Sequence, residues 1–314
     1  MPPDTVASGA MLQPACKLLY TARLSDVRAM NTDSQNARKA ILLSLLMITL
    51  ASTAVAATKF ASEMASTAAI VTVQYLICTV LCLPRILRAG AGNLRSDHIG
   101  LHFVRGVAGV LGFYLFYASL QHIPLVDAML LRQSAPLVVP LVLAVWLRER
   151  IPPAAWLPLV TGFCGIAIIL RPSPDGLSLW HAGGLASAVT LAISMVATRK
   201  LARTEPTSRI LFYYVVLSLA CVAPFSIDDF ANIPPLGWLA MLYIGTAIYW
   251  TLELYTRAYG MAPTALIAPI NYFAVVLAAF WGWLFWNQMP DIWSAAGSVL
   301  VIGGGLMTIF LANR

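Results

Sequence analysis

Residues 124–133 read PLVDAMLLRQ, and residues 263–272, which lie 139 positions later, read PTALIAPINY. Both stretches start with a proline that opens a long apolar segment. The correspondence continues upstream, because Lys59, near the end of one apolar segment, matches Arg199, 140 positions later, near the end of another. The chain is therefore predicted to consist of two related halves, each with five apolar segments.

An odd number of spans in each half has a topological consequence. If the first copy enters the membrane from one side, a second copy of five spans must enter from the other side. Inverted repeats of this kind build secondary transporters, with the substrate site between the halves near the bilayer midplane. We therefore predict an all-α membrane protein with ten transmembrane helices, arranged as two inverted five-helix repeats at residues 38–172 and 180–314. Residues 1–37 are polar and aperiodic, and we expect a flexible cytoplasmic tail there.

The composition excludes a water-soluble fold. The chain is 60% hydrophobic and 11% charged, with a mean hydropathy of +0.79. A soluble domain has about a quarter charged residues, whereas a bilayer-spanning helix needs about 20 apolar residues in sequence. The ten predicted spans are residues 39–58, 68–87, 98–120, 124–147, 153–171, 182–201, 208–226, 236–259, 263–286 and 291–312. They leave little chain for a soluble domain.

The net charge of +7 indicates topology. If both termini lie inside, 16 of the 20 Lys and Arg residues fall on the inner side, and only Lys59 and Arg171 fall on the outer side. Cytoplasmic loops of membrane proteins carry such an excess of Lys and Arg. We therefore expect a multi-pass protein of the cytoplasmic (inner) membrane with cytoplasmic N and C termini, in contact with lipid and not with nucleic acid.

The sequence carries no sign of a cofactor. No P-loop, Gly-rich nucleotide loop or hydrolytic triad is present, so ATP-driven transport and catalysis lack support. His98 and His102 have the i and i+4 spacing of metal ligands, but they lie at the cytoplasmic start of a span with only Asp97 nearby. We expect no metal, no cofactor and no enzymatic activity.

Several motifs resemble the EamA module of the drug/metabolite transporter superfamily. In the first half they are Ala118 through Pro124, Ala135-Pro136, Trp146 through Arg150, Gly162, Gly165 and Leu170, and in the second half Ala265 through Pro269, Gly282 through Leu284 and the final glycine-rich helix. The resemblance covers about residues 38–312. It implies ten helices in two inverted five-helix repeats, a central cavity and alternating access, with small metabolites as the usual cargo and export as a common direction.

One departure from the family pattern concerns the end of the fourth helix of each repeat. The glutamate that commonly stands there is present as Glu149, but the second copy has Gln288 at the matching position. A mechanism that requires a matched pair of carboxylates is therefore not expected.

Ionisable residues inside the spans are candidates for function, because each costs about 2.5 kcal/mol or more at the bilayer centre. Arg132 has no partner at i±3 or i±4, so another helix, water or the substrate must supply one. Glu253 either faces the substrate or pairs with Arg257 four residues on. Asp127, near the outer mouth, either caps its helix or carries protons. Arg105 lies about one turn from the cytoplasm and can snorkel to it.

Both halves place polar residues at a similar depth, because Asn271 and Tyr272 match Arg132 and Gln133 at the repeat offset. Prolines close to both sites free backbone carbonyls, which are tolerated only where protein or a wet cavity satisfies them. The predicted substrate-binding residues are Arg132, Gln133, Glu253, Tyr249, Trp250, Asn271, Tyr272, Gln74 and Tyr114. For the aromatic members, simple packing is an equally good interpretation.

We predict a secondary transporter, most simply an exporter of a small polar or zwitterionic metabolite: an amino acid, an amino-acid derivative or an opine-type metallophore. The inferred cavity would then hold a cation, Arg132, and an anion, Glu253 or Asp127. The alternative is an uptake transporter for a vitamin, nucleoside or adenosyl-type metabolite that stacks on the aromatic residues. A membrane-embedded enzyme is a remote alternative. Without an ATP motif, a proton gradient is the simplest driving force, and Glu253 and Asp127 are the candidate carriers.

Overall fold

The computed structural model describes residues 38–89, 95–146, 148, 153–170, 178–261, 270–289 and 291–312, and this part of the chain is helical without any strand. Its helices are, in chain order, Arg38–Ala61, α2 (Thr67–Ala89), α3 (Ile99–Leu120), α4 (Leu125–Gln133), α5 (Ala135–Trp146), α6 (Pro153–Leu170), α7 (Leu179–Leu201), α8 (Thr207–Val222), α9 (Pro235–Met261), α11 (Phe273–Trp286) and α12 (Ile292–Ala312). Two 3-10 turns, η2 (Ala223–Phe225) and η3 (Ile227–Phe230), follow α8. The predicted tail at residues 1–37, Glu149 and the stretch 263–269 lie outside the described residues.

The predicted all-α membrane fold is confirmed. Of the helices that the structure describes, six are long and apolar enough to cross a bilayer, and three shorter apolar stretches are Trp156–Ile169, Phe273–Trp286 and Ile292–Met307. The remaining long helix, α9, has 27 residues and carries the polar residues of the eighth span. Each predicted span thus has a helix at its place in the chain.

The fourth span differs from the continuous helix that we predicted for residues 124–147, because it breaks at Ser134 between α4 and α5. Pro136 has no N–H, so the carbonyl of Arg132 loses its usual donor. The Ser134 hydroxyl donates to the carbonyl of Leu131 at 2.5 Å and competes with the helical bond there. The result is a local interruption of the helix at Ser134, within a single span of 22 residues, Leu125–Trp146.

The ninth span has a turn residue one position from the equivalent place. Tyr272 is this residue, and it lies between the helical residues 270–271 and α11. After the first break, the N–H of Leu137 donates to the Ser134 carbonyl at 2.9 Å; after the second, the N–H of Val275 donates to the Tyr272 carbonyl at 3.0 Å. The same tight turn thus recurs 138 positions later, and the repeat extends to the backbone.

A pair of tyrosines marks the axis that relates the two halves. Tyr75 of α2 and Tyr214 of α8 are 139 positions apart, and their hydroxyl oxygens lie 2.9 Å from one another. Both side chains are buried, and their rings meet edge to face at 5.7 Å. A contact between equivalent residues of two related halves lies on the axis between them.

Reciprocal glycine contacts confirm this symmetry at the other end of the molecule. A Cβ atom added to Gly165 of α6 would lie 2.8 Å from the backbone N of Val301, and one added to Gly304 of α12 would lie 2.7 Å from that of Gly162. Gly304 is the repeat equivalent of Gly165, and Val301 is that of Gly162. The repeat symmetry therefore converts each of these two contacts into the other. Only small residues allow helices to approach this closely in lipid.

Two residues with a left-handed backbone show the same offset. Arg148 has φ 55° and Asn287 has φ 51°, and no other non-glycine residue of the described chain has a positive φ. Asn287 ends α11, where its N–H donates to the carbonyl of Trp283 at 3.1 Å. Asparagine is among the residues that tolerate this conformation best. The turn sends Gln288 back toward the bundle.

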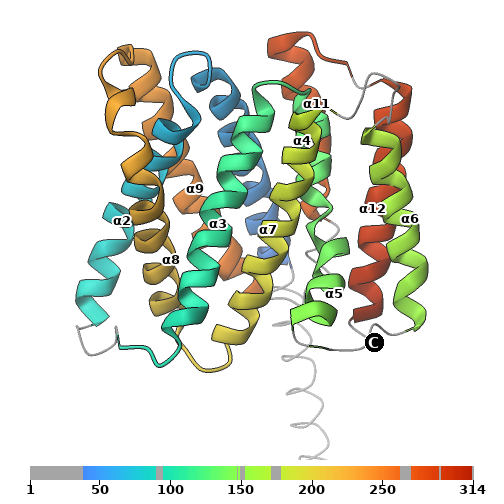
Figure 1. Ribbon diagram of the computed structural model, residues 1–314, viewed down its shortest axis with the longest axis horizontal. Coiled ribbons are helices and arrows are strands. Elements are labelled where there is room, and N and C mark those ends of the chain that lie inside the picture. The colour runs from blue at the N-terminus through green and yellow to red at the C-terminus, as the bar shows by residue number, and fades with distance from the viewer. Residues whose placement is uncertain are drawn as a thin grey trace, which may run out of the picture.

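Helices that the repeat relates also pack in matching pairs. The second span of each half pairs as α2 with α8, the fourth as α4 with α11, and the fifth as α6 with α12. The contacts of α3 with α8 and of α2 with α9 are one another's counterparts. In Figure 1, α2 and α8 stand at the left end of the bundle and α6 and α12 at the right end, so the breaks in α4–α5 and before α11 lie between them.

Substituting neighbouring glycines of α12 tests the close approach. A Cβ at Gly304 would meet the carbonyl of Pro158 at 2.6 Å, whereas a Cβ at Gly303 would meet nothing within 4 Å. Gly304→Ala should therefore lower the unfolding temperature of the solubilised protein, with an overpacking cost of about 1–3 kcal/mol. Gly303→Ala is the control and should leave the temperature unchanged or raise it, because alanine favours helix by about 1 kcal/mol. Equal unfolding temperatures for the two variants would contradict the packing.

Candidate functional site

The two helix breaks face one another. The side-chain amide of Gln133, at the end of α4, donates to the backbone carbonyl of Asn271 at 3.0 Å. Backbone groups freed inside a membrane need a partner from the protein or from a wet cavity. Gln133 supplies that partner across the interface between the halves. Two predicted site residues are thus brought together at the predicted place.

Arg132 lies half-buried next to this bond, and α3 provides its contacts. Its Nη1 donates to the carbonyl of Gly112 at 3.1 Å, and its guanidinium lies 4.5 Å from the ring centre of Phe113 and 4.7 Å from that of Phe116. Cation–π contacts contribute about 0.5–2 kcal/mol, against a cost of about 2.5 kcal/mol or more for a charge at this depth. A guanidinium has five N–H donors, and the described residues engage one. The group keeps most of its capacity to bind an anion.

A polar network lies behind these rings. Tyr117 donates its hydroxyl to Oε1 of Gln74 at 2.5 Å, and both side chains are buried. Tyr75 meets Phe113 edge to face at 6.2 Å. Gln74, which the sequence suggested as a substrate-binding residue, therefore lies within the polar centre of the bundle. Its Nε2 has no hydrogen-bond partner among the described residues.

Arg105 differs from its sequence interpretation as a snorkelling side chain. Its guanidinium lies 4.6 Å from the ring centre of Tyr214, and its Nη1 donates to the hydroxyl of Thr198 in α7. Both partners belong to the bundle interior. Arg105 is therefore a second arginine directed into the protein. A depth estimate from the sequence could not anticipate this, because the ring of Tyr214 reaches α3 only in the folded bundle.

The two candidate proton carriers have protein partners. Glu253 is buried, and its Oε1 accepts from both Nε and Nη2 of Arg257 at 2.9 Å. The salt bridge that the i and i+4 spacing allowed is formed. Asp127 is also buried and accepts from the hydroxyl of Ser294 in α12 at 2.6 Å. None of the described contacts joins either carboxylate to Arg132.

The aromatic candidates are distributed over several environments. Trp250 is 47% exposed on α9, and Tyr249 beside it is half-buried and packs against the main core. Tyr272 is buried, and its hydroxyl lies where a side chain at Gly305 would stand, because an added Cβ would come within 1.6 Å of it. Tyr272 therefore faces α12, and Gly305 makes room for it.

Tyr114 lines a separate cleft of about 1030 Å³ between α3, the end of α8 and the turn before α2. Glu63 and Asp229 belong to the polar lining of this cleft, and Val110 and Val222 belong to its apolar wall.

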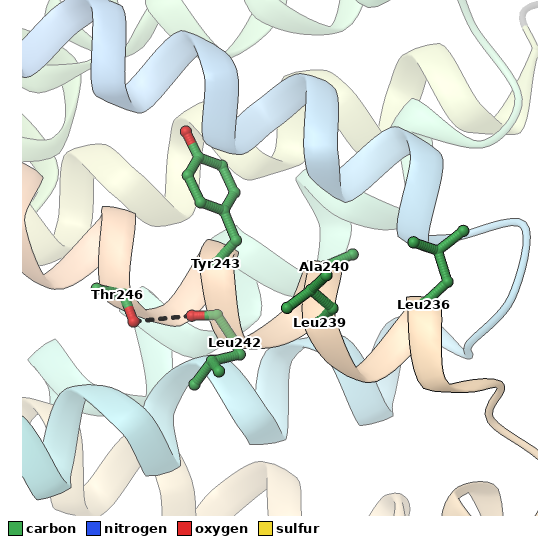
Figure 2. A pocket seen from close by; sticks show the side chains of 6 residues that line it. All are labelled: Leu236, Leu239, Ala240, Leu242, Tyr243 and Thr246. Carbon is green, nitrogen blue, oxygen red and sulfur yellow. Dashed lines mark hydrogen bonds between the residues drawn. The ribbon is translucent and has the colours of Figure 1, made fainter.

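A second hollow is a shallow groove along the exposed face of α9, which Figure 2 shows. Its lining consists of apolar residues together with Tyr243 and Thr246. Arg132 lines neither hollow.

Gln288 closes the end of the bundle at which the turn before α2 lies. Its Oε1 accepts from the backbone N–H of Leu125 at 3.2 Å and from Nζ of Lys59 at 3.3 Å. Lys59 also donates to the carbonyl of Ile123 at 3.2 Å and lies 5.5 Å from the ring centre of Trp286. An amide oxygen thus performs the acceptor function that a carboxylate would perform here.

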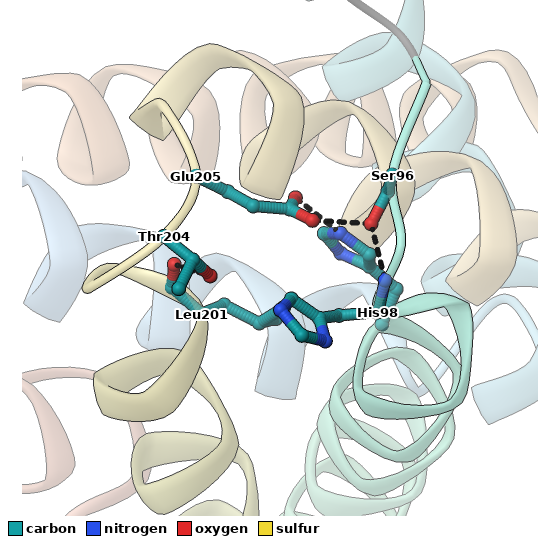
Figure 3. Close-up of polar contacts among 6 residues, drawn as sticks. Ser96, His98, Leu201, Thr204 and Glu205 are labelled. Atoms are coloured by element: carbon teal, nitrogen blue, oxygen red, sulfur yellow. Dashed lines mark hydrogen bonds and ion pairs between the residues drawn. The ribbon is translucent and has the colours of Figure 1, made fainter.

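A polar cluster joins the loops at the opposite end. Figure 3 shows the Glu205 carboxylate, in the turn after α7, facing Ser96, in the segment before α3. Ser96 donates its hydroxyl to Oε1 of Glu205, and Nε2 of His102 lies 2.7 Å from Oε2. His102 is fully buried and stacks on Tyr213 at 4.4 Å. His102 is therefore part of a structural cluster.

The loops at the Gln288 end of the bundle contain a counterpart of this cluster. Ser66 donates its hydroxyl to Oδ2 of Asp229 in η3. Ser66 and Glu205 are repeat equivalents, 139 positions apart. Each end of the bundle therefore has a serine–carboxylate hydrogen bond between equivalent loops. The donor, Ser66, at one end stands at the position of the acceptor, Glu205, at the other end.

The pKa of Glu205 is lowered from its ordinary value. Burial by itself raises it, but the hydrogen bonds from Ser96 and His102 and the electrostatic effect of the nearby His102 and Arg209 lower it by more. Ionised Glu205 therefore stabilises the fold at neutral pH, and this contribution disappears as the pH falls through its folded pKa, below 4.5.

Glu205→Gln should lower the unfolding temperature of the solubilised protein at neutral pH, and the difference from wild type should shrink as the medium is acidified below the ordinary pKa of a glutamate. Asp97→Asn, which removes an exposed carboxylate from the neighbouring segment, is the control for net charge. A difference between Glu205→Gln and wild type that stays constant down to strongly acidic pH would contradict the assignment.

The fold and the site define a class of protein: a multi-pass membrane transporter with broken helices from two inverted repeats around a polar centre. The model of the EamA-like transporter family matches residues 38–171 and 178–310. The chain belongs to this family, as its motifs indicated.

Individual relatives agree with this assignment. The pseudopaline exporter CntI of Pseudomonas aeruginosa strain PAO1 is 33% identical over 267 residues, which cover 84% of this chain and 94% of the exporter. A riboflavin transporter of Brucella anthropi is 28% identical over 239 residues, 74% of this chain and 84% of that protein. A crystal structure with a TM-score of 0.59 and 22% identity, covering 88% of this chain and 98% of its own, shares the fold.

Proposed function

We propose that the protein is a secondary transporter of the cytoplasmic membrane that exports a small carboxylate-bearing metabolite, an opine-type metallophore, by alternating access. The similarity to an exporter of pseudopaline over 94% of that protein's length carries the proposal. Relatives that are named as transporters also favour transport over catalysis. The excess of Lys and Arg on one side favours cytoplasmic termini.

The central site supports an anionic solute. Arg132 lies beside the two helix breaks with free N–H donors, and arginine binds carboxylates in bidentate geometry. The sequence suggested a zwitterion held between Arg132 and either Glu253 or Asp127. Both carboxylates are bonded elsewhere, to Arg257 and to Ser294. The solute therefore needs an anionic group more than a cationic one.

Exchange of a labelled opine in proteoliposomes tests the proposal. N-(1-carboxyethyl)alanine is a simple opine, and the wild type should exchange it across the membrane. Arg132→Ala should abolish exchange, and Arg132→Lys should impair it nearly as much, because lysine cannot form the bidentate contact. Arg203→Lys, at an exposed arginine, is the matched control. Full exchange by Arg132→Ala would remove Arg132 from the site, and exchange of riboflavin without the opine would support the uptake alternative.

We propose a proton gradient as the driving force and Glu253 as the carrier, with Asp127 as the second candidate. A desolvated carboxylate can take up and release a proton during alternating access. Glu253 is buried, whereas the side chain of its partner Arg257 is 55% exposed, so the pair can separate toward water.

Glu253→Gln keeps the size of the side chain and fixes the neutral state. This variant should lose opine accumulation driven by a pH gradient and keep opine exchange, and Asp127→Asn is the parallel variant. A wild-type protein that does not respond to an imposed pH gradient would exclude proton coupling.

A further inference from the structure

We propose that the solute is a dicarboxylate held at two points, with Arg132 binding one carboxylate and Arg105 a second. This inference rests on the proposed function, because it names the substrate class of the same site. Its starting point is a pair of guanidinium groups, on α3 and α4, that both point into the bundle. Among the described residues, no carboxylate lies within ion-pair distance of either group.

One aromatic wall connects the two arginines. Arg105 lies 4.6 Å from the ring centre of Tyr214, and Arg132 lies 4.5 Å from that of Phe113. Tyr75 stands between these rings, with its centroid 5.7 Å from Tyr214 and 6.2 Å from Phe113. The three rings thus lead from one guanidinium group to the other.

Helix α3 gives a measure of the separation. The ring of Tyr214 lies against Gly109, where an added Cβ would come within 2.3 Å of it. Arg132 lies against Phe113 and Phe116 of the same helix. At 1.5 Å of rise per residue, these contact points are roughly 6–10 Å apart along the helix axis. Two carboxylates joined by a short carbon chain, as in an opine or a dicarboxylic acid, can reach both.

Unused hydrogen-bond donors lie beside this wall. Nε of Arg105 and Nε2 of Gln74 are buried and have no hydrogen-bond partner among the described residues. The oxygen of Gln74 already accepts from Tyr117, so its amide nitrogen is the end without a partner. Both groups can only donate. The complementary ligand is therefore rich in acceptors, as a carboxylate is.

Charge decides between one carboxylate and two. Two cations in a medium of low dielectric constant repel one another and are costly to keep there. Water can accept hydrogen bonds from them but cannot neutralise them. A zwitterionic amino acid has one carboxylate for two arginines, whereas a dicarboxylate supplies one carboxylate to each. The arrangement therefore favours a dicarboxylate over an amino acid.

Three compounds with one carbon skeleton test the number of carboxylates. Glutarate has two, its monoamide glutaramate has one, and the diamide glutaramide has none. Each is titrated against the purified full-length protein in nanodiscs, and the dissociation constant is obtained by calorimetry. Wild type should bind glutarate at least about tenfold more tightly than glutaramate, because the second carboxylate gains a charge-assisted contact. Glutaramide should bind most weakly.

Variants of the two arginines test which group holds which carboxylate. Arg105→Gln should remove the preference for glutarate and leave the affinity for glutaramate unchanged. Arg132→Gln should weaken both acids. Arg105→Lys keeps the charge and should retain part of the preference for glutarate. It replaces Arg105→Gln in the test if that variant proves too unstable to measure. Arg203→Gln, at an exposed arginine, removes the same charge and should change nothing.

The possible results separate this inference from the proposed function. Three results would each overturn the dicarboxylate inference. They are equal affinities for glutarate and glutaramate in wild type, an unchanged preference for glutarate in Arg105→Gln, and no saturable binding of any of the three compounds. If one of these results were found and opine exchange still depended on Arg132, the proposed export would stand without the two-carboxylate inference. If the wild type exchanged no opine and nevertheless preferred glutarate, the export proposal would fail and the two-point anion site would stand.

Discussion

The backbone cannot be left unbonded inside a bilayer, and this constraint shapes the centre of the molecule. The fourth and ninth spans both break, and Gln133 closes the second break by donating to the carbonyl of Asn271. Because that bond crosses between the halves, the residue before it, Arg132, is held at the interface and not at the lipid. This bond accounts for the packing of α4 against α11 and for the position of Arg132 against α3.

The repeat in the sequence was enough to predict the helical spans and their order, and the structure brings Gln133 and Asn271, one residue from each half, into contact. Local spacing also predicted the Glu253–Arg257 pair, which needs only one turn of helix. The position of Arg105 could not be predicted in this way. Its partner Tyr214 lies 109 positions later and reaches α3 only because Gly109 leaves room for the ring. The repeat offset did contain one unused signal, since the equivalent residues of the two halves include Tyr75 and Tyr214 themselves.

The two ends of the bundle use different chemistry for similar closures. One end has Lys59 with the amide of Gln288, and a serine bonded to an aspartate. The other end adds a buried histidine to its serine–glutamate bond. The sequence showed the change from glutamate to glutamine as a lost carboxylate. In the structure, the amide oxygen accepts two hydrogen bonds, so the replacement removes a charge and keeps the closure.

The bond between Tyr75 and Tyr214 has a kinetic consequence, because it lies on the axis that relates the halves. When two inverted repeats exchange their conformations, a contact on the axis is converted into itself. It therefore contributes nearly the same free energy to the inward-facing and the outward-facing states and cannot bias one over the other. Any effect that it has on transport is therefore on the rate of exchange between the two states, and the residues away from the axis set which side the protein rests open to.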